Sequence, residues 1–296
     1  MPHSTVIQRY FPQSEIIRLS RPKGGISADL TIVELIQNNR HYKIVIRQIP
    51  QAAQEYKLLK ILQSAGVASP IPLFLDESCE LLPAPFLILT YISGETRYRF
   101  SNKVQAGEKI GAQLARIHAI KTTGFDLSFL PTDSTHLPES SGHPAERPIL
   151  DILEPLWPLP QTDSPVLLHG DFWPGNMLWQ DADLVGVIDW EDAKVGNRLQ
   201  DLAISRFDTL FIFGRQAMQA LTESYFENSS IDRHQLPYWD LFAALRAAPG
   251  IPQWAAGWPE LGRPDLTKAA IWKSLSWFIQ QAKAKINTIG EVPDTN

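Results

Sequence analysis

Residues 169–176, with the sequence HGDFWPGN, combine polar side chains that could do chemistry with a backbone broken by glycine and proline. Asp171 and Asn176 lie five positions apart in this segment, directly after a short apolar run. A second apolar run, 184–188, leads into Asp189, thirteen positions beyond Asn176. Polar side chains in loops can be held rigidly by a scaffold while they stay open to a ligand. We therefore expect Asp171, Asn176 and Asp189 to converge on one site.

The types of these three side chains favour phosphoryl transfer. Carboxylate and carboxamide oxygens suit Mg²⁺, which prefers one or two carboxylates together with waters and phosphate oxygens. Asn176 and Asp189 could hold the metal ion, while Asp171 could accept the proton of an attacking hydroxyl. Phosphoryl transfer needs one group that binds the metal and another that takes the proton, because the protein mainly aligns the nucleophile and neutralises charge on the transferred group.

Short β-branched runs in the first part of the chain predict a sheet that could position such a site. The polar pair Asn38-Asn39 separates two of these runs, which is typical of a hairpin. One intervening segment has leucines at helical spacing and stops before Gly66, as a helix would. The predicted strands are 15–19, 30–35, 42–47, 71–75 and 86–92, and the predicted helix is 51–65.

An ion pair is predicted between the third strand and this helix. Glu55 lies on the core-facing stripe of the helix. A carboxylate there is costly to bury unless a cation accompanies it. Arg47, on the preceding strand, supplies that cation.

From residue 104 to the end, the pattern is mostly helical, interrupted by short strands near the polar loops. His118 lies on an apolar helical stripe, so we interpret it as a core histidine rather than a ligand. His169 is interpreted as a structural residue that holds the loop. Asp201 is expected to fasten the same loop by accepting backbone N–H bonds.

The order of His169, Asp171, Asn176 and Asp189 resembles the catalytic and metal-binding loops of protein-kinase-like enzymes. The forms HGDFWPGN and IDWEDA are similar to those of the aminoglycoside phosphotransferase and choline kinase-like family, whose members phosphorylate small molecules. The resemblance implies an α+β, two-lobed protein-kinase-like fold. An antiparallel five-stranded lobe, 1–92, would bind the nucleotide, and a mainly helical lobe, 93–296, would carry catalysis and acceptor binding.

The resemblance also implies which residues bind the nucleotide. The glycines and serine of the segment PKGGIS would cover the phosphates in a hairpin loop. Arg47, steadied by Glu55, would contact the phosphates at a position where the family usually has lysine, which is chemically a different cation. The backbone of a hinge would hold the adenine ring. The implied residues are Gly24, Gly25, Ser27, Arg47, Glu55, Thr90, Tyr91 and Ile92.

The reaction expected from this resemblance is that of a small-molecule kinase. ATP or GTP would supply the phosphoryl group with Mg²⁺, and a hydroxyl of a small molecule would accept it. Glu191 and Asp192 follow the metal-binding Asp189. If these two carboxylates line the acceptor site, the acceptor is expected to be cationic. The identity of the acceptor and the oligomeric state stay open.

Composition excludes several other classes of protein. The chain has 296 residues, a net charge of −5 and 44% hydrophobic residues, so it lacks the excess of cations that nucleic-acid binding requires. Cys79 is the only cysteine, which excludes an intrachain disulfide. The sequence contains neither a signal-peptide core nor a long apolar run. We expect a cytoplasmic protein without nucleic-acid or membrane partners.

Two alternatives remain open at this point. The first is a non-catalytic, kinase-like module that binds a nucleotide, a reading motivated by arginine at position 47. The second is a metal-dependent hydrolase built on His169, Asp171 and Asp189, which would give the glycine hairpin and the hinge no purpose. Acceptor-dependent formation of ADP would argue against both.

Overall fold

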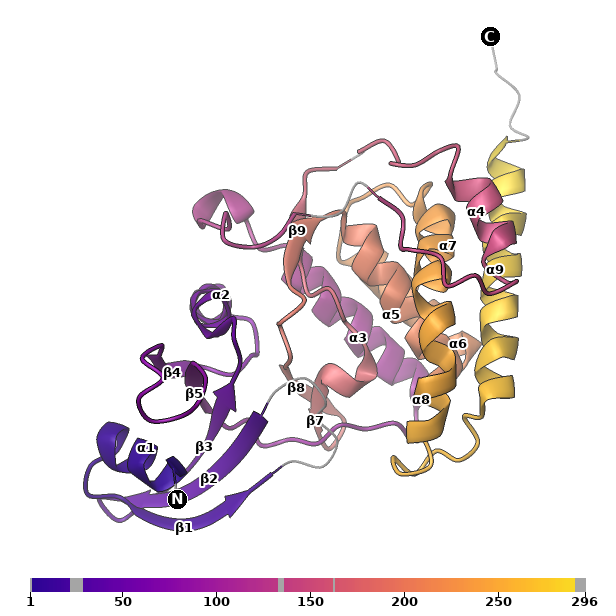
Figure 1. Cartoon of the computed structure of the whole chain (residues 1–296). Helices are drawn as coiled ribbons and strands as arrows, with labels where there is room; N and C mark the ends of the chain where they lie inside the picture. The colour runs from indigo at the N-terminus through magenta and orange to yellow at the C-terminus, as the bar shows by residue number, and fades with distance from the viewer. Residues whose placement is uncertain (1, 22–28, 133–135, 162, 291–296) are drawn as a thin grey trace. The chain divides into compact units, whose positions relative to one another are not determined.

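The computed structural model describes residues 2–21, 29–132, 136–161 and 163–290 (Figure 1). The chain divides into two compact units. Unit 1 comprises Met1–Glu95 together with Val185–Glu191, and unit 2 comprises Thr96–Leu184 together with Asp192–Asn296. The segment that carries Asp189 therefore packs with the first unit, although it follows the loop segment 169–176 in the sequence.

Unit 1 is built on a five-stranded antiparallel sheet with the strand order β1-β2-β3-β5-β4. The turn between β2 and β3 places Asn38 and Asn39 at φ 52° and 59°, the left-handed region that asparagine tolerates. The strands and helix predicted from the sequence are all present. The elements of this unit are α1 (Pro2–Tyr10), β1 (Glu15–Ser20), β2 (Asp29–Gln37), β3 (Arg40–Gln48), α2 (Ala52–Ser64), β4 (Pro72–Asp76) and β5 (Phe86–Thr90).

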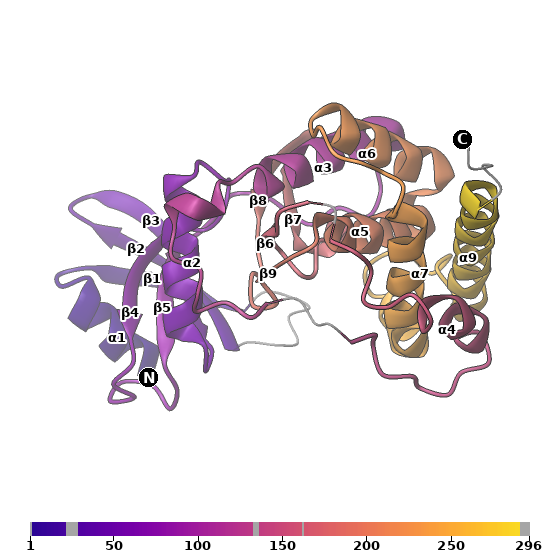
Figure 2. The same ribbon diagram turned by 90° about the horizontal axis from the view of Figure 1, so that it is seen from above.

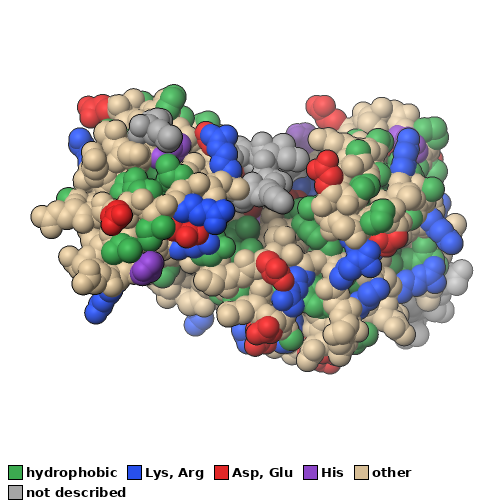
Figure 3. Space-filling view, turned by 90° about the horizontal axis from the view of Figure 1, so that it is seen from below, with side chains coloured by type: hydrophobic (Ala, Val, Ile, Leu, Met, Phe, Trp, Pro, Cys, Tyr) green, Lys and Arg blue, Asp and Glu red, His purple; other side chains and the backbone are tan. Residues whose placement is uncertain are grey.

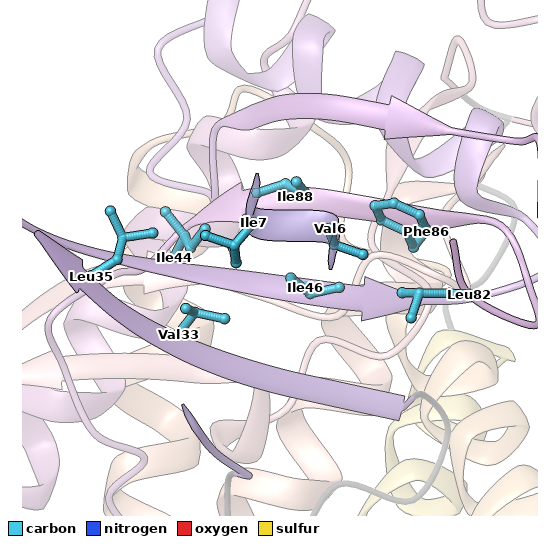
Figure 4. Packing of buried hydrophobic residues seen from close by; sticks show 9 residues of the cluster. All are labelled: Val6, Ile7, Val33, Leu35, Ile44, Ile46, Leu82, Phe86 and Ile88. Carbon is cyan, nitrogen blue, oxygen red and sulfur yellow. The ribbon is translucent and has the colours of Figure 1, made fainter. Parts of the chain in front are cut away.

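One hydrophobic cluster packs α1 against the sheet (Figure 4). The helix contributes Val6 and Ile7, which are fully or almost fully buried. Alternate residues of β2, β3 and β5 supply most of the rest, because a strand presents every second side chain to the same face, and Leu82 comes from the segment between β4 and β5. The buried members are Val6, Ile7, Val33, Leu35, Ile44, Ile46, Leu82, Phe86 and Ile88. Helix α1 was not predicted.

Unit 2 is mainly helical, with short strands at the polar loops. Strands β6 and β9 pair antiparallel, and β7 pairs with β8. The α-helices are α3 (Lys103–His118), α4 (Arg147–Leu153), α5 (Arg198–Phe213), α6 (Arg215–Glu227), α7 (Leu236–Ala247), α8 (Ile251–Gly257) and α9 (Lys268–Gly290). The remaining elements are η1 (Thr122–Gly124), β6 (Val166–Leu168), η2 (Pro174–Asn176), β7 (Met177–Gln180), β8 (Asp183–Val187), β9 (Lys194–Gly196) and η3 (Ala248–Gly250). Strand β8 crosses the boundary, because its residues from Val185 onward belong to unit 1.

Helix α5 is the central element of unit 2 and packs against α6, α7 and α9 (Figure 2). From Leu199 onward all of its residues are buried. Arg206 on this helix makes a bidentate ion pair with Asp240 on α7, with N–O distances of 2.9 Å for both bonds. Because both side chains are buried, this pair ties the two helices together at a defined position. The same two helices carry several residues of the candidate site.

Figure 3 shows a face on which Lys and Arg side chains are interspersed with Asp, Glu and hydrophobic side chains. This mixed surface agrees with the small net charge of −5. Among the described residues, no helix is both long and apolar enough to cross a membrane.

Candidate active site

The loop segment 169–176 is anchored by Asp201 of α5, as predicted. The fully buried carboxylate accepts the backbone N–H of His169 at 2.6 Å and that of Gly170 at 3.0 Å, using a different oxygen for each. Burial opposes ionisation, but the hydrogen bond from His118 and the charges of His118 and His169 hold the pKa of Asp201 below its usual value. The loop therefore leaves strand β6 from a fixed point.

His118 is a core histidine, as interpreted from the sequence. Its Nδ1 lies 2.8 Å from the hydroxyl of Tyr225, and its Nε2 lies 3.4 Å from Asp201 Oδ2. The side chain is buried, and burial lowers its pKa despite the opposing effect of Asp201. His118 thus supports the anchor of the loop.

Asp171 and Asn176 are brought together by the turn between β6 and β7. The amide nitrogen of Asn176 donates to the backbone carbonyl of Asp171 at 2.9 Å and to its Oδ2 at 3.3 Å. Gly170 has φ +84°, and a Cβ there would lie 2.1 Å from the carbonyl oxygen of Asp192, so only glycine fits. The Asp171 side chain is 32% exposed. A candidate base is therefore held in place while one side stays accessible.

Two further residues surround Asp171, and neither was singled out from the sequence. Arg246 of α7 donates from Nη2 to Asp171 Oδ1 at 3.1 Å. Asp208 of α5 is buried, and burial together with the charge of Asp171 raises its pKa to about 8, although Arg246 acts in the opposite direction. Arg246 is 75 positions from Asp171 in the sequence, so no local spacing connects the two.

The raised pKa of Asp208 predicts a pH-dependent stability. Between about pH 4 and pH 8 the folded protein keeps a proton that the unfolded chain has released. The free energy of unfolding should therefore fall as pH rises through this window, by at most about 1.4 kcal/mol per pH unit from this group. Asp208→Asn cannot ionise, so it should gain stability relative to the wild type as pH rises.

Urea denaturation at several pH values between 5 and 8 would measure this difference. Asp151→Asn is the control, because Asp151 is an exposed residue paired with Arg147 on the surface. A difference between Asp208→Asn and the wild type that stays constant over the whole range would contradict the prediction.

In unit 1, the predicted ion pair between Arg47 and Glu55 is present. Arg47 Nε donates to Glu55 Oε2 at 3.0 Å, and both side chains are buried. Burial raises the pKa of Glu55, an effect that the charge of Arg47 partly opposes. The guanidinium is thus a structural partner of a buried carboxylate.

Arg47 also binds two carboxylates of the segment that follows β8. Its Nη2 donates to Asp189 Oδ1 at 2.8 Å and to Glu191 Oε2 at 3.0 Å. Although burial opposes protonation, the charges of Glu55 and Asp189 raise the pKa of Arg47. Glu191 therefore contributes to the Arg47 cluster, a contact that was not predicted from the sequence.

The backbone around Asp189 is fixed within unit 1. Val187 donates its N–H to the carbonyl of Ala68 at 2.8 Å, and Trp190 is buried with its indole N–H bonded to the carbonyl of Val187. Asp189 itself has φ +66°, an uncommon conformation for a residue other than glycine. Strained backbone of this kind is concentrated at functional sites.

Asn176 of unit 2 and Asp189 of unit 1 each keep an oxygen of the kind that Mg²⁺ prefers. Because the amide nitrogen of Asn176 is used on Asp171, its carbonyl oxygen is left as a ligand. Asp189 is 31% exposed, and its Oδ2 is not used by Arg47. Within the described ranges, no cluster of three or more His, Cys, Asp or Glu side chains could hold a metal. Mg²⁺ usually takes only one or two carboxylates from a protein, so a cluster of three is not required.

The predicted hinge residues lie at the end of β5. Thr90 donates its backbone N–H to Ile71 at 2.9 Å and accepts the N–H of Ile71 on its hydroxyl at 2.9 Å. Tyr91 donates its N–H to the carbonyl of Lys43 at 3.3 Å, and Ile92 packs against Gly186. The N–H groups of Thr90 and Tyr91 are therefore engaged within unit 1. Gly24, Gly25 and Ser27 lie outside the described residues.

Comparison with curated proteins gives relatives of two kinds. The chain is 26% identical over 183 residues to acyl-CoA dehydrogenase family member 10 of Mus musculus. The matched region covers 51% of this chain and 16% of the relative. It is 29% identical over 140 residues to an aminoglycoside 3'-phosphotransferase of Escherichia coli. That match covers 40% of this chain and 51% of the relative. Identity to acyl-CoA dehydrogenase family member 11 of Homo sapiens is 24% over 238 residues, covering 67% and 30%. The matches thus span about half or less of each relative.

Solved structures match over almost the whole chain. A spectinomycin phosphotransferase in complex with ADP and spectinomycin has a TM-score of 0.61 at 14% identity, covering 95% of this chain and 96% of that one. A macrolide 2'-phosphotransferase from Brachybacterium faecium has a TM-score of 0.61 at 17% identity, covering 90% and 96%. A family model described as the phosphotransferase enzyme family matches residues 38–245. The chain therefore belongs to the phosphotransferase enzyme family and has its α+β, protein-kinase-like fold.

Proposed function

We propose that this protein transfers the γ-phosphoryl group of ATP or GTP to a hydroxyl of a small molecule. The observation that carries the proposal is the fixed and accessible carboxylate of Asp171, held by Asn176 and Arg246 on a loop that Asp201 anchors. Membership of the phosphotransferase enzyme family supports the same reaction.

In the proposed reaction, the acceptor oxygen forms a bond to the γ-phosphorus while the bond from that phosphorus to the β,γ-bridging oxygen breaks. Asp171 orients the acceptor hydroxyl and takes its proton, and the nucleoside diphosphate leaves. Asn176 and Asp189 would hold Mg²⁺, which neutralises phosphate charge when bound. Apart from this chemistry, the chain binds the nucleotide and the acceptor and orients them for the reaction.

Nucleotide binding is proposed for unit 1. Gly24, Gly25 and Ser27 would cover the phosphates, Arg47 would contact them, and the hinge formed by Thr90, Tyr91 and Ile92 would hold the base. Relatives were solved with nucleotides: an aminoglycoside phosphotransferase with AMP-PNP and hygromycin B at TM-score 0.60, and another of the group with GDP and kanamycin at TM-score 0.56. These complexes support use of a purine nucleotide by this chain.

The expected cationic charge of the acceptor is not part of this proposal. That expectation depends on Glu191 and Asp192, and Glu191 is bound to Arg47. Composition supports a cytoplasmic enzyme that needs neither a nucleic acid nor a membrane, because the net charge is −5 and there is a single cysteine.

A screen for ADP or GDP release over a panel of small hydroxyl compounds tests this function. The panel should include aminoglycosides, amino alcohols, sugars, hydroxy acids and macrolides, with the Asp171→Asn protein as background. We expect at least one compound to stimulate nucleoside diphosphate release by the wild type and to leave the variant at the background rate. Hydrolysis that no acceptor stimulates would contradict the proposal.

The observation that favours the non-catalytic alternative is that Nε and Nη2 of Arg47 are already bound to Glu55, Asp189 and Glu191. An arginine committed in this way has fewer donors for phosphate than the lysine that the family resemblance implies. A rise in melting temperature with Mg-ATP, without turnover of any acceptor in the panel, would support that alternative.

A further inference from the structure

Arg246 places a positive charge directly beside the proposed base. Its guanidinium donates to Asp171 Oδ1 at 3.1 Å, and its side chain is 36% exposed. A guanidinium has five N–H donors, and this bond uses one of them. In the part of the chain that the structure describes, Asp171 is the only residue seen to hydrogen-bond to this guanidinium. Donors remain for a ligand on the exposed side.

Among the described residues, Asp171 is the one carboxylate that forms an ion pair with Arg246. The charge of Arg246 also opposes the rise in the pKa of Asp208, a carboxyl that is buried in α5. Burial favours its neutral form, consistent with a pKa of about 8. Asp171 is shared between Arg246 and Asn176. The pair formed by Arg246 and Asp171 is therefore neutral in total, with the cation and the anion each partly open to solvent.

The position of the reacting hydroxyl determines which part of an acceptor lies near Arg246 and Asp171. The reacting hydroxyl must come within about 3 Å of Asp171 to transfer its proton. A substituent one to three carbons from that hydroxyl then lies within reach of the Arg246 guanidinium. A carboxylate or phosphate there could pair with the planar guanidinium through two parallel bonds, which an ammonium cannot do.

Aromatic side chains flank the same loop. Trp173, two positions after Asp171, is half-buried and stacks on Tyr98 with the ring centroids 6.1 Å apart and an interplanar angle of 22°. Both rings contact the buried Trp258 edge to face. The loop that presents Asp171 is thus rigid and apolar on this side, a surface that suits the carbon skeleton of a ligand better than a second charge.

We propose that Arg246 makes the site selective for acceptors that carry a carboxylate or phosphate group within a few carbons of the hydroxyl that is phosphorylated. This inference rests on the proposed phosphotransferase function and names the acceptor class for it. Arg246 is the specificity residue, and Asp171 remains the base.

Matched compounds test the proposal. Hydroxycarboxylates of two to six carbons are assayed next to their own amides and next to amino alcohols of the same length, and kcat and KM are measured for each. The wild type should favour a carboxylate over its amide at least tenfold in kcat/KM, with the difference mainly in KM. Phosphorylated sugars and the parent sugars form a second arm that separates phosphate from carboxylate recognition.

Arg246→Gln should reduce the preference for carboxylate over amide to about one, and Arg246→Lys should restore part of it. The ratio is the informative readout, because a loss of support for Asp171 would slow all acceptors alike. Arg147→Gln is the matched control, since Arg147 is an exposed arginine on α4 paired with Asp151. An unchanged ratio in Arg246→Gln, or a wild type that prefers amino alcohols, would overturn the inference.

A binding measurement separates this inference from the proposed function. Calorimetric titration of the same hydroxycarboxylates into the protein with Mg-ADP detects acceptor binding without turnover. Binding that Arg246→Gln abolishes, with no turnover of any compound, would support the inference and reject the function. Turnover of cationic or neutral acceptors alone would support the function and reject the inference. If neither anions nor other acceptors bind, both are overturned.

Discussion

Asp171→Asn is expected to abolish acceptor phosphorylation while nucleotide affinity stays within a few-fold of the wild type. A general base contributes about 10²–10⁴-fold to the rate, and the amide cannot take the proton. Asparagine keeps the size of the side chain and an oxygen that can accept from Arg246, whose bond to Asp171 Oδ1 is 3.1 Å long. Steady-state kinetics and nucleotide titration on the same preparation would measure both quantities.

The control for this experiment is Asp151→Asn, a change of the same chemistry at an exposed residue of α4. It should leave kcat unchanged. Asp171→Ala is the less informative variant, because it removes the partner of both Arg246 and Asn176 and can move the loop. Wild-type kcat in Asp171→Asn would show that the residue is not the base.

Arg47→Ala is expected to destabilise the protein by about 3–5 kcal/mol, because it leaves the buried Glu55 without its cation. The loss should be smaller at low pH, where Glu55 can be protonated. Burial already raises the pKa of this carboxyl, and removing Arg47 removes the charge that opposes the increase. Urea denaturation at pH 5 and pH 8 would measure the effect.

Two variants sharpen the experiment on Arg47. Arg40→Ala removes an exposed arginine from the start of the same strand and should change stability little. Combining Arg47→Ala with Glu55→Gln should recover part of the lost stability, because the buried group no longer ionises. A double variant as unstable as Arg47→Ala at pH 8 would show that the unpaired charge of Glu55 is not the cause.

The sheet of unit 1 was predictable because its signals are local. Strand β2 alternates buried with partly exposed residues, and the Asn38-Asn39 turn is recognisable from two residues. Helix α1 was not predictable in the same way. It has nine residues, and the cluster draws only Val6 and Ile7 from it as buried members, so its apolar periodicity is too short to detect.

The candidate site was predictable where a buried charge demanded a partner. The cost of burying an unpaired carboxylate predicted the pair of Arg47 and Glu55. The hydrogen-bonding capacity of a carboxylate predicted Asp201 as the acceptor of loop N–H groups. Arg246 gave no such signal, because it is one polar position on the otherwise buried helix α7 and meets Asp171 only through the tertiary fold. The roles assigned to Asn176 and Asp189 stay predictions.

The most direct test of the account is a crystal structure of the wild-type protein with Mn²⁺ and AMP-PNP, in which anomalous scattering locates the metal. We expect Mn²⁺ on the nucleotide phosphates, with Asn176 Oδ1 and a carboxylate oxygen of Asp189 among its ligands at about 2.1 Å. Asp171 should lie near the γ-phosphate without binding the metal. A metal ion that binds neither Asn176 nor Asp189 would contradict the account.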